Sequence, residues 1–209
     1  MKRLWGVATR MSPERPRESG DFVAALQRVP WITLAVVAAT LVMPAALEYD
    51  RAAILRGEVW RLVTGHLTHW SPDHLLWDVL AFLALGFVCE RRRRALYAGV
   101  LFVSAMSVSL ILLAGCPEVT SYRGLSAVAS ALWFWAALII AERRLTPAFM
   151  LLALFFVKVM IELTTGTSVF ASDIAVLPSV HLIGAAVGFC GAVAEHKMQR
   201  LTHAALHAP

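Results

Sequence analysis

Residues 122–144 read YRGLSAVASALWFWAALIIAERR. Small residues follow a Gly-Leu pair, a strongly apolar run comes next, and Glu142, Arg143 and Arg144 end it. An apolar run bounded by charges predicts a helix that crosses a membrane, here over residues 125–141. Ser126 lies where that helix begins. Small residues are common in membrane helices, so Ser126 alone is compatible with simple helix packing.

The composition of the whole chain is that of an integral membrane protein. Of its 209 residues, 59% are hydrophobic and 16% are charged, and the mean hydropathy is +0.68. A soluble domain has about one half apolar and about one quarter charged residues. We therefore expect an all-α membrane protein.

Six apolar segments can be drawn along the chain, which predicts a bundle of six transmembrane helices. A helix needs roughly 17 to 25 residues to cross the hydrocarbon without tilting. The fourth and sixth segments have only about 16 residues each, so their outer ends should lie below the membrane surface. The segments lie near residues 30–47, 74–89, 95–115, 125–141, 147–163 and 180–195.

The basic residues gather on one side of this predicted bundle. A net charge of +5 can indicate nucleic-acid binding, so the positions of the charges matter more than their sum. If the segments alternate in direction, 14 of the 19 Lys and Arg residues share one side, in residues 1–29, 90–94, 142–146 and 196–209. The positive-inside rule places that side, with both termini, in the cytoplasm. No nucleic-acid partner is expected.

The chain is expected to form one domain between two tails. We expect residues 1–29 to form a mobile, basic cytoplasmic tail and residues 30–195 to form the six-helix core. Residues 196–209 are expected to form a cytoplasmic C-terminal tail. A secretory signal is the alternative for the N-terminus, but five further spans follow it. Residues 48–73 mix tryptophans with charges, which suits an outer loop lying in the membrane interface. The three cysteines share no oxidising side, so no disulfide is expected.

Four polar side chains lie toward the outer ends of these segments. They are His74 and Asp78 on the second, Ser126 on the fourth and His181 on the sixth. A charge at the centre of a membrane costs about 2.5 to 3.5 kcal/mol on insertion scales, so each such group needs an explanation. Four of them at a common depth predict a shared polar cavity.

Ser126 and His181 both begin helices that run inward. Gly184 and Gly188 follow His181 on one helix face and would let another helix approach closely. If that helix is the fourth segment, the imidazole can reach the Ser126 hydroxyl. A serine bonded to a histidine is the minimum apparatus for nucleophilic acyl transfer, and it needs no cofactor.

Several motifs of the chain, in this order and spacing, resemble those of the rhomboid intramembrane serine proteases. They are Trp60-Arg61, HLTHWSPDHLLWD at 66–78, GLSA at 124–127 and HLIGAAVG at 181–188. The resemblance implies a six-helix rhomboid-like fold, with Ser126 as nucleophile, His181 as general base and no acidic third member. It implies that His74, Asp78, Gly124 and the Ser126 N–H surround the oxyanion, and that Trp60 and Arg61 are structural residues of the first outer loop.

The compact size, the HLLWD motif and the Arg-rich loop look most like the rhombosortase branch of this family. That resemblance implies that the protein removes C-terminal Gly-Gly-containing anchors from exported bacterial proteins. The partners would be membrane-anchored substrates that arrive from the lipid bilayer. The protein would lie in the bacterial inner membrane, with its active site open to the periplasmic side.

Three positions depart from the family pattern. Ala127 replaces a common glycine, and Ser130 replaces an aromatic that often stacks on the base, so His181 must be oriented by another group. Asp78 stands where an oxyanion-donating amide is usual. Either a protonated Asp78 donates a hydrogen bond as an amide does, or an ionised Asp78 holds His74 as a cationic donor.

Three other functions compete with a serine protease. His66, His69, His74 and Asp78 could bind zinc, since imidazoles and a carboxylate are suitable ligands. A rhomboid-like protein could also bind transmembrane helices without cutting them, although it would have no need for both Ser126 and His181. Lys158 and Glu162, spaced i, i+4, could form an ion relay of a transporter, but a mutually neutralising pair that faces a cavity is the simpler interpretation.

Overall fold

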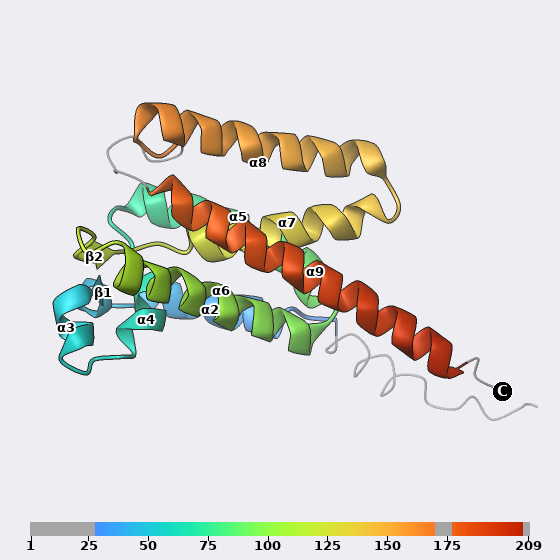
Figure 1. Cartoon of the computed structure of the whole chain (residues 1–209), viewed down its shortest axis with the longest axis horizontal. Coiled ribbons are helices and arrows are strands. Elements are labelled where there is room, and N and C mark those ends of the chain that lie inside the picture. The colour runs from blue at the N-terminus through green and yellow to red at the C-terminus, as the bar shows by residue number, and fades with distance from the viewer. Residues whose placement is uncertain (1–27, 170–176, 207–209) are drawn as a thin grey trace, which may run out of the picture.

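The computed structural model describes residues 28–169 and 177–206 (Figure 1). The predicted N-terminal tail, residues 1–29, lies almost wholly outside the described residues. Within the described ranges, four helices are long and apolar enough to cross a membrane, and two further apolar helices are shorter. The protein is therefore a mostly helical, multi-pass membrane protein. The long helices are α5 (Pro72–Glu90), α6 (Arg94–Gly115), α8 (Leu145–Thr165) and α9 (Pro178–Leu206), and the short ones are α2 (Trp31–Val42) and α7 (Ser126–Ala141).

These six helices coincide with the six predicted segments, but two of them end elsewhere. The first ends at Val42 rather than at residue 47, because Met43 precedes Pro44 and adopts an extended conformation. The last continues to Leu206, so the predicted C-terminal tail is helical over residues 196–206. Residues 196–206 hold neither glycine nor proline, so nothing in them breaks the helix.

The long loop between α2 and α5 folds into short elements. They are η1 (Ala45–Leu47), β1 (Tyr49–Asp50), α3 (Arg51–Leu55), α4 (Arg61–Thr64) and η2 (Gly65–Leu67). The first strand pairs antiparallel with β2 (Ser121–Tyr122), with Tyr49 opposite Tyr122. Arg123 then donates to Glu48 at 2.7 Å. The loop thus fixes the chain just before Ser126.

His66 anchors this loop to α6. It is 2% exposed, and its Nε2 lies 3.0 Å from both the Ala105 carbonyl oxygen and the Ser109 hydroxyl. The Ser109 hydroxyl in turn donates to the Leu62 carbonyl at 2.7 Å. Burial lowers the pKa of His66 to about 4, against a smaller opposing effect of its hydrogen bond to Ala105. His66 is therefore a neutral structural histidine at neutral pH.

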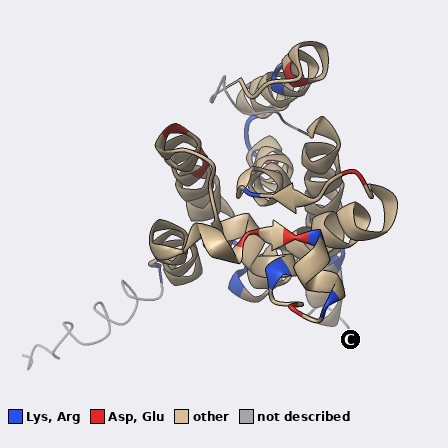
Figure 2. Ribbon diagram, turned by 90° about the vertical axis from the view of Figure 1, so that its left-hand side faces the viewer, with Lys and Arg blue, Asp and Glu red and all other residues tan. Residues whose placement is uncertain are grey.

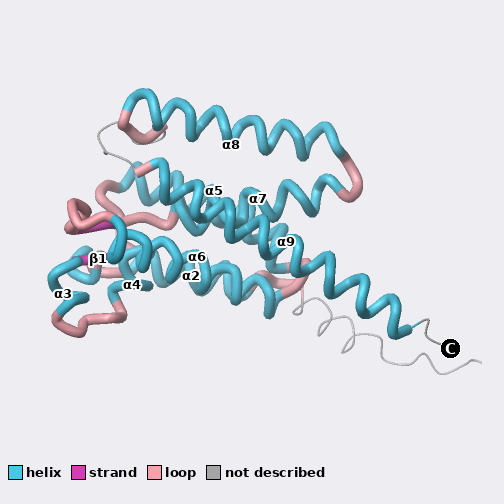
Figure 3. The backbone as a smooth tube through the Cα atoms, in the orientation of Figure 1, coloured by secondary structure: helices cyan, strands magenta, loops and turns pink. Residues whose placement is uncertain are grey.

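Helix α7 lies at the centre of the bundle, with α5, α6, α8 and α9 around it (Figure 3). Nine of its 16 residues are buried. At about 1.5 Å per residue it is roughly 24 Å long, less than the ~30 Å hydrocarbon thickness. A helix of this length does not span the hydrocarbon on its own, and its first residue, Ser126, starts beside the first turn of α9.

Small residues allow α7 and α9 to pack closely. A methyl group at Gly184 would lie 2.0 Å from the Ala127 carbonyl oxygen, and one at Gly188 would lie 2.0 Å from that of Ala131. Only glycine fits at either position without moving a backbone. This close approach brings the start of α9 against the start of α7.

Ion pairs involving the buried carboxylates Glu90 and Glu195 fix the end of the bundle where α2, α6 and α8 begin. Glu90 accepts hydrogen bonds from the first backbone N–H groups of α2, at Ile32 and Thr33, and from Arg94. Arg92 bonds both Glu142 and Glu195. These contacts place the loops rich in arginine together, while Figure 2 views the other end, where basic and acidic residues share the loops.

Candidate active site

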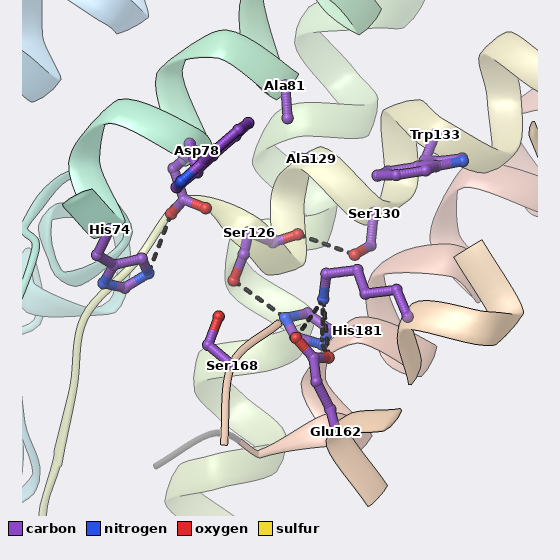
Figure 4. Close-up of a pocket in the computed structure, with 12 residues that line it drawn as sticks. His74, Asp78, Ala81, Ser126, Ala129, Ser130, Trp133, Glu162, Ser168 and His181 are labelled. Carbon is purple, nitrogen blue, oxygen red and sulfur yellow. Dashed lines mark hydrogen bonds and ion pairs between the residues drawn. The ribbon is translucent and has the colours of Figure 1, made fainter. Parts of the chain in front are cut away.

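A small cavity lies where α5, α7, α8 and α9 meet, near the first residues of α7 and α9 (Figure 4). Its volume is about 50 Å³, which holds one or two water molecules but no peptide. It is lined by His74, Trp77, Asp78, Ala81, Ser126, Ala129, Ser130, Trp133, Lys158, Glu162, Ser168 and His181. The structure thus brings all four polar residues singled out in the sequence to one cavity.

Ser126 and His181 form a hydrogen-bonded pair inside this cavity. Ser126 is the first residue of α7, and the 2% exposed His181 lies in the first turn of α9. The Ser126 hydroxyl oxygen lies 3.0 Å from His181 Nε2. This is the contact that a general base needs to take the proton of a nucleophile.

The other ring nitrogen of His181 faces α8. His181 Nδ1 lies 2.9 Å from the Glu162 carboxylate, and Lys158 Nζ lies 2.7 and 2.8 Å from the two carboxylate oxygens. The expected pair between Lys158 and Glu162 is therefore present and lines the cavity, but it also contacts the histidine. The sequence interpretation missed this contact. The need for a group to orient His181, once Ser130 replaces an aromatic, was the signal that could have found it.

Ser130 turns its hydroxyl to the backbone, donating to the Ser126 carbonyl oxygen at 2.8 Å. Back-bonding of this kind satisfies a polar side chain within its own helix. Ser130 therefore does not bond His181, whose two nitrogens face Ser126 and Glu162.

Asp78 accepts several hydrogen bonds at the start of α7. Its Oδ2 lies 2.9 Å from His69 Nε2, 3.3 Å from His74 Nε2 and 2.8 Å from the Leu125 backbone nitrogen. His69 was assigned no protease role from the sequence, yet it makes the shorter of the two histidine contacts. One carboxylate oxygen facing these three donors acts as an acceptor, so the geometry favours an ionised Asp78 over a donor role for that oxygen. A negative charge here also suits the amino-terminal end of a helix.

Gly124 fits tightly between these groups. Its φ of +128° is a conformation that residues with a side chain rarely adopt. A methyl group there would also lie 2.9 Å from the His74 ring. Glycine at this position therefore lets the chain turn into α7 while the imidazole of His74 rests against it.

Trp60 and Arg61 lie away from the cavity, in the loop between α2 and α5. Arg61 donates to the carbonyl oxygens of Ala46 and Glu48 at 2.7 and 2.9 Å, and to the Glu58 carboxylate at 2.7 Å. These bonds tie α4 to the start of the loop. The Trp60 side chain is half exposed at the loop surface.

Three residues near the cavity could hold a metal ion. Ligand atoms of His69, His74 and Asp78 lie within 4.8 Å of one another. His66, the fourth ligand in the zinc alternative, is not in this group, since its Nε2 faces Ala105 and Ser109. The four-ligand site that competed as an alternative interpretation of the sequence is therefore reduced to three residues. In the three that remain, the two Nε2 atoms already face Asp78 Oδ2.

Comparison with known proteins adds one match. Residues 56–197, more than half of the chain, match the family model of the Rhomboid domain. The match includes the cavity and every residue named in this subsection except Ala46 and Glu48. No curated protein matches the chain.

Proposed function

The chain belongs to the rhomboid family, whose members are intramembrane serine proteases, and on that premise we propose that it is an intramembrane serine endopeptidase. Ser126 is the nucleophile and His181 the general base. The observation that carries this proposal is the 3.0 Å contact between the Ser126 hydroxyl and His181 Nε2 inside a cavity of a membrane protein.

In the proposed reaction, the Ser126 oxygen attacks the carbonyl carbon of the scissile peptide while His181 Nε2 takes its proton. The tetrahedral intermediate then collapses, the C–N bond breaks, and His181 gives the proton to the leaving amine. Water attacks the resulting ester in the same way and releases the acyl group. No metal or other cofactor takes part.

The negative charge of the intermediate is proposed to rest near the start of α7. The first backbone N–H groups of a helix have no partner within it and point toward incoming negative charge. The Ser126 N–H is one of these, and His74 supplies a second donor. Asp78 does not donate in this scheme; it orients His74 and binds the Leu125 N–H.

The substrate is proposed to enter laterally from the bilayer, as expected for a family that acts on membrane-embedded proteins. All six helices cross or enter the membrane, with both termini in the cytoplasm and the cavity toward the periplasm of a bacterial inner membrane. The grouping of arginines at one end supports this orientation. Because the cavity of about 50 Å³ is too small for a peptide, neighbouring side chains or helices must move to admit one.

The substrates are proposed to be C-terminal membrane anchors that contain Gly-Gly. A peptide bond within a helix is hidden by its own hydrogen bonds, so the anchor must unwind before it is cut. Glycine in a helix interior costs about 1 kcal/mol relative to alanine, which makes unwinding easier. Residues without a large side chain also suit a narrow cavity.

Co-expression with a Gly-Gly-anchored exported protein tests this function. Wild type should release the protein from the membrane, and Ser126→Ala should leave it anchored. Ser130→Ala is the matched control, because Ser130 lines the same cavity yet bonds only the backbone. Equal release by wild type and Ser126→Ala would show that the proposed nucleophile is wrong.

A metal-dependent activity is the second candidate, supported by the proximity of His69, His74 and Asp78. A serine mechanism predicts unchanged cleavage after dialysis against a chelator. Loss of cleavage on chelation, restored by zinc, would favour the metal-dependent alternative.

A further inference from the structure

Glu162 contacts the ring nitrogen of His181 that does not face Ser126. Its carboxylate lies 2.9 Å from His181 Nδ1 and is 1% exposed. A buried carboxylate at this distance from an imidazole is costly unless both are satisfied by each other or by a third group. The contact joins α8 to α9 directly behind the proposed nucleophile.

This contact fixes the position of the imidazole proton. A carboxylate oxygen only accepts hydrogen bonds, and the 2.9 Å contact is shorter than the 3.3 Å contact from Lys158, so the geometry favours the proton on His181 Nδ1. The neutral ring then carries its lone pair on Nε2, which faces Ser126. This tautomer is the one that can accept the serine proton; with the proton on Nε2, the histidine would be inactive as a base.

Lys158 balances the charge of Glu162. Its ammonium contacts both carboxylate oxygens and lies 3.3 Å from His181 Nδ1. Both Lys158 and the Nδ1–H are donors, so each is satisfied by the carboxylate that lies between them. The lysine keeps Glu162 ionised in a low-dielectric site, and it also limits how strongly Glu162 can hold a proton on His181.

We propose that Glu162 is a positioning residue that completes a Ser126–His181–Glu162 triad, with Lys158 as its charge partner. Glu162 fixes the tautomer and orientation of His181 and stabilises the imidazolium formed when Ser126 attacks. This replaces the dyad without an acidic member that the family resemblance implies, and it rests on the proposed function. It also supplies the group that orients His181 where Ser130 replaces an aromatic.

The triad predicts opposite pH effects for its two charged members. In Glu162→Gln the imidazolium loses its carboxylate, so activity should persist to lower pH while kcat falls by about 10²- to 10⁴-fold at neutral pH. In Lys158→Met the carboxylate of Glu162 has no cation beside it and should hold a proton on His181. As the pH is lowered, activity should therefore be lost at a higher pH than in wild type. The other charged or titratable groups lining the cavity, His74 and Asp78 on α5, are the same in both variants.

The experiment measures cleavage of an anchor peptide and the rate of Ser126 labelling by a fluorophosphonate, from pH 5 to 9, in purified full-length protein. Glu162→Asp should recover part of the kcat lost in Glu162→Gln, with little change in KM. Glu195→Gln is the matched control, because Glu195 is a buried carboxylate with an arginine partner at the opposite end of the bundle. It should reduce thermal stability without moving the pH profile.

Two results would overturn the triad. One is a Glu162→Gln profile that superimposes on wild type, and the other is a loss that matches Glu195→Gln at every pH. If Glu162→Gln does not fold, Lys158→Met still decides, since a merely structural role of the pair predicts an unchanged pH profile for that variant. Failure of the proposed function looks different: wild type would neither cleave nor be labelled at Ser126, and both proposals would fall.

Discussion

At the scale of single residues, Asp78 contacts more groups around the cavity than the oxyanion role implied by the family resemblance would require. Its Oδ2 contacts two histidines and the backbone of Leu125, immediately before the proposed nucleophile. Removing its charge should therefore disturb both the orientation of His74 and the start of α7.

Asp78→Asn should lower kcat by about tenfold or more, since a hydrogen bond to a charged group contributes roughly 1.5 to 3 kcal/mol and each ~1.4 kcal/mol is tenfold in rate. An asparagine oxygen can still accept from Leu125, so the protein should fold. Steady-state kinetics on the purified variant measures the effect. Full activity in Asp78→Asn would instead support the alternative in which Asp78 is a neutral donor.

The same scale shows what the sequence could and could not predict of the site. Ser126, His181, His74 and Asp78 were predicted to share a cavity, because their depth in the membrane follows from the segment boundaries. The Glu162–His181 contact was not predicted, since it depends on the rotation of α8 about its own axis. An i, i+4 pair of opposite charges looks the same in sequence whether or not a third residue meets it.

At the scale of helices, the contact between α7 and α9 sets the distance between Ser126, the proposed nucleophile, and His181, the proposed base. Gly184 lies against Ala127, the residue next to Ser126, and Gly188 lies one turn deeper. The glycine pattern predicted a close helix contact, and the structure identifies α7 as the helix concerned. The predicted ends of α2 and α9 differ from the structure because segment length was judged from hydropathy, which does not detect where a helix stops.

Gly184→Ala should destabilise the protein by about 1 to 3 kcal/mol and reduce activity, because the new methyl group would meet a backbone oxygen that cannot move without shifting α7. Gly99→Ala on α6 is the matched control, since nothing lies within 4 Å of its added methyl group. Thermal unfolding in detergent and cleavage rate measure both effects. Equal behaviour of the two variants would contradict a tight α7–α9 contact.

At the scale of the whole molecule, a buried histidine, His66, helps to fasten the loop between α2 and α5 to the bundle, together with the β1–β2 pairing and the Arg123–Glu48 ion pair. The sequence predicted a loop lying in the interface, but it could not show that His66 is a structural anchor rather than a metal ligand. His66 is a structural anchor because its Nε2 contacts Ala105 and Ser109, which lie about 40 residues further along the chain.

The anchor makes stability depend on pH. The pKa of His66 is lowered from 6.5 to about 4 in the folded protein, so the unfolded chain binds a proton there at a higher pH than the folded chain does. This contribution to stability is fully present above about pH 6.5 and is lost as the pH falls toward 4, by up to on the order of 3 kcal/mol. Thermal unfolding midpoints across this range measure it.

His66→Gln should be less stable than wild type at neutral pH but should lose less stability between pH 6.5 and 4. The glutamine cannot take up a proton, so the two stability curves should converge on acidification. Parallel curves for the two proteins would show that His66 is not the titrating anchor.

The central claim, that Ser126 is a nucleophile activated by His181, is tested most directly by locating a covalent adduct. Purified protein is treated with a fluorophosphonate, digested and analysed by mass spectrometry. A single adduct on Ser126 is expected in wild type, and none in His181→Ala. An adduct on Ser130 or Ser168, which line the same cavity, or equal labelling of Ser126 without the histidine, would contradict the claim.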